Sequence, residues 1–324
     1  MSCQICHKTE KVSKCSRCKM AFYCSEDHQQ LDFKTHKKYC VKIKKTTIEL
    51  NNQERYLREM PADFSLPENV FEEGAGHFWG IMETRDYMRA RGQVIASLDG
   101  LGTITSLQAE LVHSLDCFRL CRSDNMGFRF LTPAVFLRLD KVQECYDFIK
   151  WWCTCDPDGR YDWGNTSLPY LNIRNANMLE PIDFFGKYTC LSFLVSMTLI
   201  KYIIYKELVS LQTIQQLNSK LPSDLVEEIK AKSRVYTPKV LASSLEDTIK
   251  QVQEQLTYCF DTVDAANVHL WPALFNPKRM LAMGLPTYTS AGDVTDVQGI
   301  FAGVYEAWKR IPGAIDYVKE IYDR

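Results

Sequence analysis

Residues 3–40 carry the strongest pattern in the sequence and read CQICHKTEKVSKCSRCKMAFYCSEDHQQLDFKTHKKYC. Eight potential metal ligands stand there as four pairs: Cys3 and Cys6, Cys15 and Cys18, Cys24 and His28, His36 and Cys40. Two intervening residues suit a knuckle whose sulfurs face one ion, and three intervening residues place both ligands on one helix face. Four such pairs fill two closed tetrahedral sites and leave no position for a water molecule. The spacing therefore predicts two structural zinc ions.

The spacing alone leaves the grouping of the four pairs open. Sequential grouping would give one site with four thiolates and a second site with two cysteines and two histidines. Interleaved grouping would give three thiolates and one imidazole at each ion. Both arrangements satisfy the coordination of zinc.

The same residues resemble the MYND-type zinc finger. All eight ligand positions of the family's pattern are occupied here, and Phe22-Tyr-Cys-Ser25 matches the sequence typical of the family at these positions. In two departures, His28 stands where most members have cysteine, and Phe33 stands where tryptophan is typical. The resemblance implies interleaved sites. One ion would be bound by Cys3, Cys6, Cys24 and His28, and the other by Cys15, Cys18, His36 and Cys40.

The resemblance also implies a function in protein binding. MYND fingers generally bind other proteins, often through short proline-containing segments. Gln29 and Phe33 fall on positions that resemble the family's peptide contacts, and their i, i+4 spacing places them on one helix face. An amide and an aromatic ring together suit peptide capture. The alternative is that Phe33 packs inside the small core of the finger.

Charge is divided unevenly along a chain whose formal net charge is -1. Residues 1–45 hold eleven basic and four acidic side chains, and the remainder holds 28 basic and 36 acidic ones. Lysines in the finger could neutralise phosphates, which keeps a nucleic-acid-associated regulator as an alternative. The lysines are scattered, however, and no groove-reading helix is recognisable. We expect the basic finger to attract acidic protein partners instead.

Helical periodicity dominates after the finger, and no convincing alternating strand is present. The sequence predicts a mostly α fold with a finger at 1–45, a helix and linker at 46–76, and a helical body at 77–324. Pro61, Pro67 and the glycines near residue 75 interrupt the helical pattern within this linker. We expect helices at 46–60, 78–98, 106–120, 128–139, 142–152, 191–211, 224–235, from 244 onward, 293–310 and 313–322, with an irregular segment at 153–181.

Part of the body resembles tetratricopeptide-type helical hairpins. Phe118-Arg-Leu-Cys121 and Ile149-Lys-Trp-Trp152 are offset by about 31–34 residues, which is near that repeat's period. The full repeat signature is missing, and Pro133 stands within a predicted helix. The expected body is therefore repeat-like, with a concave surface for a second partner.

Several classes are excluded or unsupported by the sequence. The most apolar run, from Cys190, is interrupted by Lys201, so we expect no membrane span. Met1-Ser2 runs directly into Cys3 without a secretory leader, which predicts an intracellular protein of the cytoplasm or nucleus. Lysine methyltransferases with a MYND finger need a strand-rich region and an Asn-His-Ser-Cys-type segment, and the sequence has neither. We expect an interaction protein without enzymatic activity.

Overall fold

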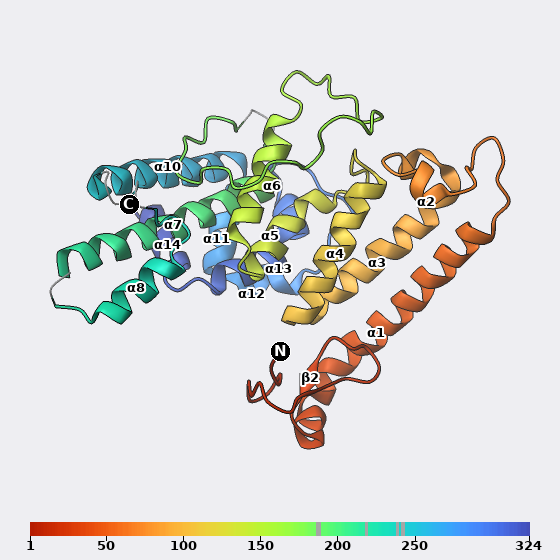
Figure 1. The fold of residues 1–324 in the computed structure, drawn as a ribbon, viewed down its shortest axis with the longest axis horizontal. Helices are drawn as coiled ribbons and strands as arrows, with labels where there is room; N and C mark the ends of the chain where they lie inside the picture. The colour runs from red at the N-terminus through yellow and green to blue at the C-terminus, as the bar shows by residue number, and fades with distance from the viewer. Residues whose placement is uncertain (186–188, 218–219, 238–239, 241–243) are drawn as a thin grey trace. The chain divides into compact units, whose positions relative to one another are not determined.

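The computed structural model describes residues 1–185, 189–217, 220–237, 240 and 244–324. The fold is mostly α-helical, as predicted, with an N-terminal finger (Figure 1). Within the finger, β1 (Ser13–Lys14) pairs antiparallel with β2 (Phe22–Tyr23), so that Ser13 lies opposite Tyr23. Two compact units make up the chain. Unit 1 comprises Met1–Val135 with Asp162–Tyr170, and unit 2 comprises Phe136–Tyr161 with Leu171–Arg324.

Unit 1 is organised along α1 (Glu26–Glu59), a helix of 34 residues. Ser25 caps its start, since the hydroxyl oxygen accepts a hydrogen bond from the His28 backbone N–H at 3.2 Å. The helix continues without a break through residues 45 and 46, where the sequence predicts a domain boundary. The finger and the helix predicted at 46–60 are therefore joined in one continuous helix.

The other helices of unit 1 are short or of moderate length. They are α2 (Val70–Glu73), η1 (Phe78–Gly80), η2 (Met82–Thr84), α3 (Arg85–Leu101), α4 (Ile104–Leu120) and η3 (Phe128–Phe130). Helix α3 packs along α1, and α4 packs on α3 (Figure 1). Ile43, Leu50 and Leu57 of α1 are buried at seven-residue intervals, which gives this long helix one continuous apolar face.

The helix predicted at 78–98 begins only at Arg85, after two 3₁₀ turns. The Thr84 hydroxyl donates to the carbonyl oxygens of Phe78 and Ile81, which replaces part of the helical backbone ladder. Phe78 is fully buried and packs against Phe71 and Tyr87, with ring centroids 5.4 and 6.0 Å away. This aromatic cluster fixes the chain before the regular helix starts.

The turn between α3 and α4 ties the finger to the helices behind it. Gly102 ends α3 with φ +66°, a left-handed conformation that glycine adopts without strain. Thr103 then caps α4, where its Oγ1 accepts from the Ser106 N–H at 3.1 Å. The same hydroxyl donates to the Met20 carbonyl oxygen at 2.7 Å. One side chain therefore holds both a helix start and the second knuckle.

Unit 2 surrounds one long buried helix. After α5 (Thr132–Arg138), which spans the division between the units, its helices are α6 (Val142–Thr154), α7 (Leu191–Leu217), α8 (Ser223–Lys232), α10 (Leu245–Ala266), α11 (Leu270–Phe275), α12 (Pro277–Ala282), α13 (Val294–Lys309) and α14 (Ala314–Tyr322). Every residue of 191–204 is buried, which makes α7 central as expected. No helix in the described ranges has the length and apolar character needed to cross a bilayer.

Helix α10 covers α7 with the stripe predicted from its spacing. Ile249, Val252, Leu256 and Phe260 are all buried there, and Ser244 caps the helix start by accepting from the Asp247 N–H at 3.2 Å. Helices α11 and α12 were not predicted from the sequence. Each has only six residues and contains or begins with proline, so the sequence there resembles a loop.

The irregular segment after α6 is fastened to both units by buried polar groups. In unit 1, Arg122 donates to the carbonyl oxygens of Asn165 at 2.6 Å and Leu168 at 2.7 Å. The Tyr170 hydroxyl donates to the Arg122 carbonyl oxygen at 3.0 Å. These bonds satisfy the main chain of a segment that has no regular secondary structure.

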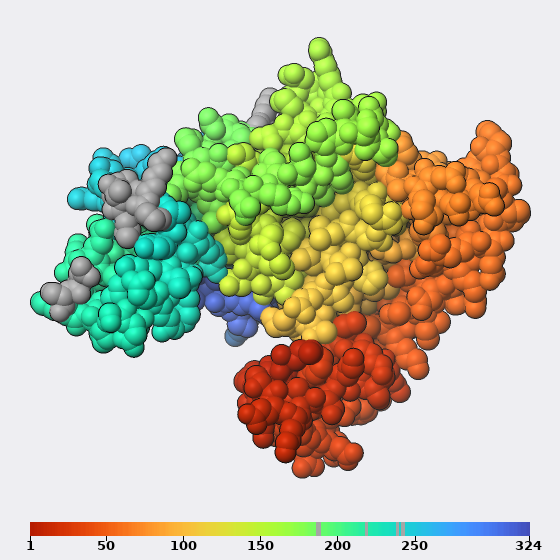
Figure 2. All heavy atoms as spheres, in the orientation of Figure 1, coloured from red at the N-terminus to blue at the C-terminus, as the bar shows by residue number. Residues whose placement is uncertain are grey.

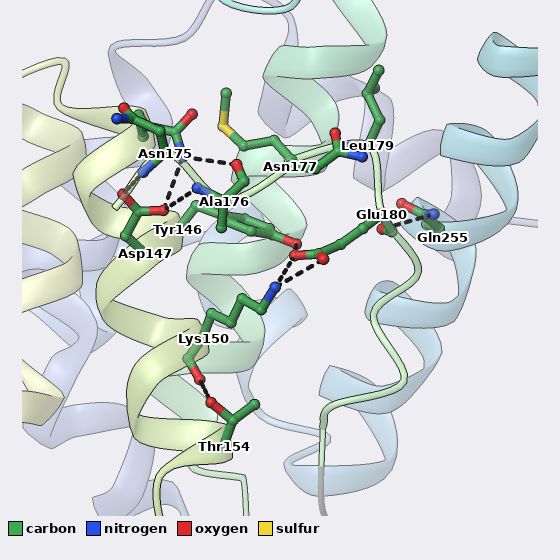
Figure 3. Close-up of polar contacts among 12 residues, drawn as sticks. Tyr146, Asp147, Lys150, Thr154, Asn175, Ala176, Asn177, Leu179, Glu180 and Gln255 are labelled. Atoms are coloured by element: carbon green, nitrogen blue, oxygen red, sulfur yellow. Dashed lines mark hydrogen bonds and ion pairs between the residues drawn. The ribbon is translucent and has the colours of Figure 1, made fainter. Parts of the chain in front are cut away.

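In unit 2, Glu180 is the centre of a second fastening (Figure 3). Its carboxylate accepts from the Tyr146 hydroxyl at 2.7 Å and from the Lys150 ammonium at 2.6 and 2.8 Å. Its carbonyl oxygen accepts from Gln255 at 3.2 Å. The segment around residue 180 is therefore held by α6 and α10 together.

Two further side chains bind the main chain of the same irregular segment, near residues 175–178. Asp147 accepts from the backbone N–H groups of Asn175 at 2.8 Å and Ala176 at 2.9 Å (Figure 3). Lys201, the charge that interrupts the apolar run of α7, is fully buried and donates to the Met178 carbonyl oxygen at 2.7 Å. Burial lowers the pKa of Lys201 to about 8. A buried lysine is tolerated here because it binds loop carbonyl groups.

We expect Glu180→Ala to lower the free energy of unfolding by about 1–3 kcal/mol, because the substitution leaves a partly buried ammonium and hydroxyl without their acceptor. Glu227→Ala is the matched control. Its ion pair with Lys230 has a carboxylate side chain that is 72% exposed, so its loss should cost less than about 1 kcal/mol. Urea denaturation followed by circular dichroism measures both variants. Equal effects would contradict the role assigned to Glu180.

Candidate metal centre

The first ligand cluster joins the first knuckle to the start of α1. Cys3 and Cys6 come from the knuckle, Cys24 follows β2, and His28 lies in the first turn of the helix. The Cys6 and Cys24 sulfurs are 3.5 Å apart. The Nδ1 atom of His28 lies 3.4 Å from the Cys3 sulfur and 3.2 Å from the Cys24 sulfur. All four donor atoms lie within 4.8 Å of one another.

The second cluster joins the second knuckle to the next turns of α1. Cys15 and Cys18 form the knuckle, and His36 and Cys40 lie four residues apart on the helix. The Cys15 sulfur lies 3.7 Å from the Cys40 sulfur and 3.4 Å from Nε2 of His36. The Cys18 sulfur lies 3.6 Å from the same nitrogen. All four side chains are buried.

These separations fit tetrahedral zinc. Zinc–sulfur and zinc–nitrogen bonds of about 2.3 and 2.0–2.1 Å place two sulfurs about 3.8 Å apart, and a sulfur and a nitrogen about 3.6 Å apart. The sulfur–sulfur and sulfur–nitrogen separations of 3.2–3.7 Å agree with this geometry. Each cluster supplies three thiols and one imidazole, so the grouping is interleaved. Four protein donors close each site and give it a structural role.

Short turns present the knuckle sulfurs. The carbonyl oxygen of Cys3 accepts from the His7 N–H, and that of Cys15 accepts from the Lys19 N–H, both at 3.0 Å. His7 and Lys19 have φ values of +59° and +63°, so each knuckle ends with a left-handed residue. The ligands His36 and Cys40 need no such turn, because their spacing places both on one face of α1.

The electrostatics of the clusters favour a bound cation. Burial raises the pKa of Cys3, but hydrogen bonds from the backbone of Cys6, Ile5 and Cys24 bring it down to about 5. Burial also raises the pKa of Cys15, but hydrogen bonds from the Cys18 backbone and the His36 side chain bring it down to about 6. In contrast, burial and the electrostatic influence of nearby Cys18 raise the pKa of Cys40 to about 12. Thiolates crowded in this way repel one another, and a divalent cation removes that repulsion.

Outside the ligands, the structure locates the residues predicted to contact peptide. Gln29 and Phe33 lie one turn apart on α1, between the ligands His28 and His36. The Phe33 side chain is 53% exposed, so it does not belong to the buried core of the finger. The Lys37 ammonium lies 5.3 Å from the centre of the Phe33 ring. Both residues are therefore close to the zinc sites and available at the surface.

Two supporting contacts were missed by sequence reasoning. The Tyr23 hydroxyl donates to Asp32 at 2.7 Å and fixes β2 to α1. The Thr103 hydroxyl reaches Met20 across 83 positions of sequence. A cap at Thr103 could be recognised from the preceding Gly102, but its partner in the finger has no local signal. In the space-filling view, the finger forms a small projecting lobe of unit 1 (Figure 2).

We expect Cys6→Ala and Cys18→Ala each to reduce the zinc content from two ions to one, because each removes one ligand from a different closed cluster. Cys153→Ala, outside both clusters, should leave two ions and serves as the control. Elemental analysis of the purified variants measures the ratio. Loss of both ions in either variant would show that the clusters are not independent.

A chelator should unfold the finger and spare most of the helical signal. Zinc binding contributes about 10–16 kcal/mol to the folding of zinc-finger peptides, whereas unit 2 contains neither ligand cluster. Far-ultraviolet circular dichroism with added chelator measures the loss. Complete loss of helicity would contradict this independence.

Comparison with known proteins supports the same assignment for this part of the chain. Residues 3–40 match the family model of the MYND finger. Human Egl nine homolog 1 is 47% identical over 38 residues, which is 12% of this chain and 9% of that protein. The mouse Egl nine homolog 1 is 45% identical over 38 residues, 12% of this chain and 10% of that protein.

The chain thus spans about a tenth of the length of these curated relatives, and the likeness lies within the finger. No solved structure shows a significant match. The tetratricopeptide-like character of the body stays a prediction. Residues 3–40 are a MYND zinc finger with two Cys₃His zinc sites.

Proposed function

We propose that the chain is a non-enzymatic adaptor whose finger captures a short peptide segment of a partner protein. A MYND finger is a zinc-binding protein-interaction module, which supplies the general part of this proposal. The observation that carries the specific part is the 53% exposure of Phe33, an aromatic side chain between two zinc-ligating turns. A large exposed ring on a rigid support is typical of binding hot spots.

The neighbouring groups suit a proline-containing segment. Proline-rich segments bind aromatic surfaces in an extended conformation and lose little entropy on binding. Gln29, one turn before Phe33, offers an amide that both donates to and accepts from a peptide backbone. The zinc sites hold this helical turn in place, so the finger does not have to order itself on binding.

The absence of enzymatic activity is part of the proposal. Both zinc clusters are closed by four protein ligands, which suits structure rather than catalysis. A cysteine nucleophile needs a lowered pKa. Burial instead raises the pKa of Cys153 and Cys259 to about 12 and holds that of Cys145 well above its usual value. Cys145 and Cys259 are buried, which is typical of core thiols, and Cys153 is partly buried.

We expect Phe33→Ala and Gln29→Ala to weaken partner capture, with about a tenfold to thirtyfold loss for Phe33→Ala, because truncation of a hot-spot aromatic costs about 2 kcal/mol. Leu31→Ala is the control, since Leu31 is 70% exposed on the same helix. Affinity purification with the full zinc-loaded chain measures capture, and elemental analysis checks that two ions remain.

If partners are retained equally by Phe33→Ala and the Leu31→Ala control, the peptide face is not at Phe33. If the chain retains duplex DNA instead of a protein partner, the result favours the nucleic-acid-associated function over the adaptor function. A steep decrease of DNA binding with salt would identify phosphate contacts in that case.

A further inference from the structure

Beyond the last zinc ligand, α1 borders a groove of about 700 Å³. Its lining comes from seven helix residues between Val41 and Glu49, from Arg17 of the second knuckle and from Gln93 of α3. Helices α1 and α3 lie side by side in this region (Figure 1). The groove therefore belongs entirely to unit 1, and apart from Arg17 its lining residues lie outside the stretch that matches the MYND finger.

The groove has an apolar component on the helix surface. Val41 and Ile48 are 43% and 49% exposed, and both line the groove. Their spacing of seven residues places them on the same side of α1, two turns apart. Aliphatic side chains in a hollow favour an apolar partner, because covering them removes their surface from water.

The groove also carries unbalanced positive charge. Arg17, Lys42, Lys44 and Lys45 line it, and Glu49 is the single acidic residue among the lining residues. None of these four basic side chains forms an ion pair within the part of the chain that the structure describes. Lys45 lies four residues after Val41 and three before Ile48, so charge and apolar surface alternate on one face.

We propose that this groove is a second docking site, which binds an acidic segment of a partner protein with apolar side chains between its carboxylates. The apolar side chains contact Val41 and Ile48, and the carboxylates lie over Lys42, Lys44, Lys45 and Arg17. Charge complementarity selects the acidic segment and speeds its approach, while the apolar contacts hold it.

Other occupants fit this groove less well. Single-stranded nucleic acid binds by stacking its bases on aromatic rings, and the lining residues include no aromatic side chain. A second copy of the chain would have to bury about 800 Å² on each partner for a stable dimer. A groove of about 700 Å³ admits a few side chains of a short segment rather than a folded surface.

This site is separate from the Gln29 and Phe33 face, and it does not depend on the function proposed for that face. The eight residues from Phe33 to Val41 advance about 12 Å along the helix and turn about 80° around it. One α1 helix thus presents two different binding surfaces. The finger surface offers an aromatic ring and an amide, and the groove offers aliphatic groups and lysines.

Fluorescence anisotropy with the full zinc-loaded chain tests the proposal. The probe is a fluorescein-labelled peptide of about 12 residues in which glutamate and leucine alternate. Its extended length of about 40 Å exceeds the about 12 Å of α1 between Val41 and Glu49. A second probe has serine in place of leucine, and a third has lysine in place of glutamate. We expect the first probe to bind, and the second and third to bind at least about tenfold more weakly.

Three variants separate the groove from bulk charge. Lys42→Glu with Lys45→Glu, and separately Ile48→Ser, should each weaken binding of the first probe at least about tenfold. Lys34→Glu with Lys38→Glu makes the same charge change at exposed positions of α1 outside the groove lining and should change binding less than about twofold. Phe33→Ala should leave this probe unaffected, which distinguishes the groove from the peptide face. Circular dichroism and zinc content verify folding.

Four results would overturn the proposal. The first is equal weakening by the two charge-reversal pairs, and the second is equal binding of the leucine and serine probes. The third is displacement of the first probe by duplex DNA at lower concentration than by unlabelled peptide. The fourth is a dimer of the chain in sedimentation that the Lys42 and Lys45 reversals dissociate, which would identify a second copy as the occupant.

Discussion

Zinc coordination is the interaction on which the N-terminal part of the molecule depends. The buried apolar side chains of residues 1–40, apart from ligand cysteines, are Ala21, Phe22 and Tyr23, too few for a self-sufficient core. Interleaved ligation compensates for this, because each ion joins one knuckle to a different turn of α1. The metal therefore sets the path of the chain as well as stabilising it.

The consequence of this coordination extends along α1. One uninterrupted helix carries His28, His36 and Cys40, then packs along α3 through Ile43, Leu50 and Leu57. The exposed Phe33 ring and most of the residues that line the groove belong to this same helix. The positions of these surfaces relative to the zinc ions are therefore fixed by helix geometry rather than by a linker.

The parts of the structure that follow from local spacing could be predicted, and the parts that depend on distant contacts could not. Ligand pairs at two and three intervening residues, the Ile249 to Phe260 stripe and the Ser244 cap are all local signals. The helix predicted at 78–98 was too long, because the hydroxyl of Thr84 and the burial of Phe78 override helical propensity. The location of the groove depends on the packing of α3, which no pattern in residues 41–49 reveals.

The irregular segment after α6 has a consequence for how the chain can be divided. Its residues 162–170 are held by Arg122 in unit 1, while its flanking residues belong to unit 2. The polypeptide therefore passes between the units three times, and neither unit is one continuous stretch of sequence. Cutting the gene at any single codon yields an incomplete fragment on at least one side. A continuous fragment that holds every residue of one unit therefore also holds residues of the other unit.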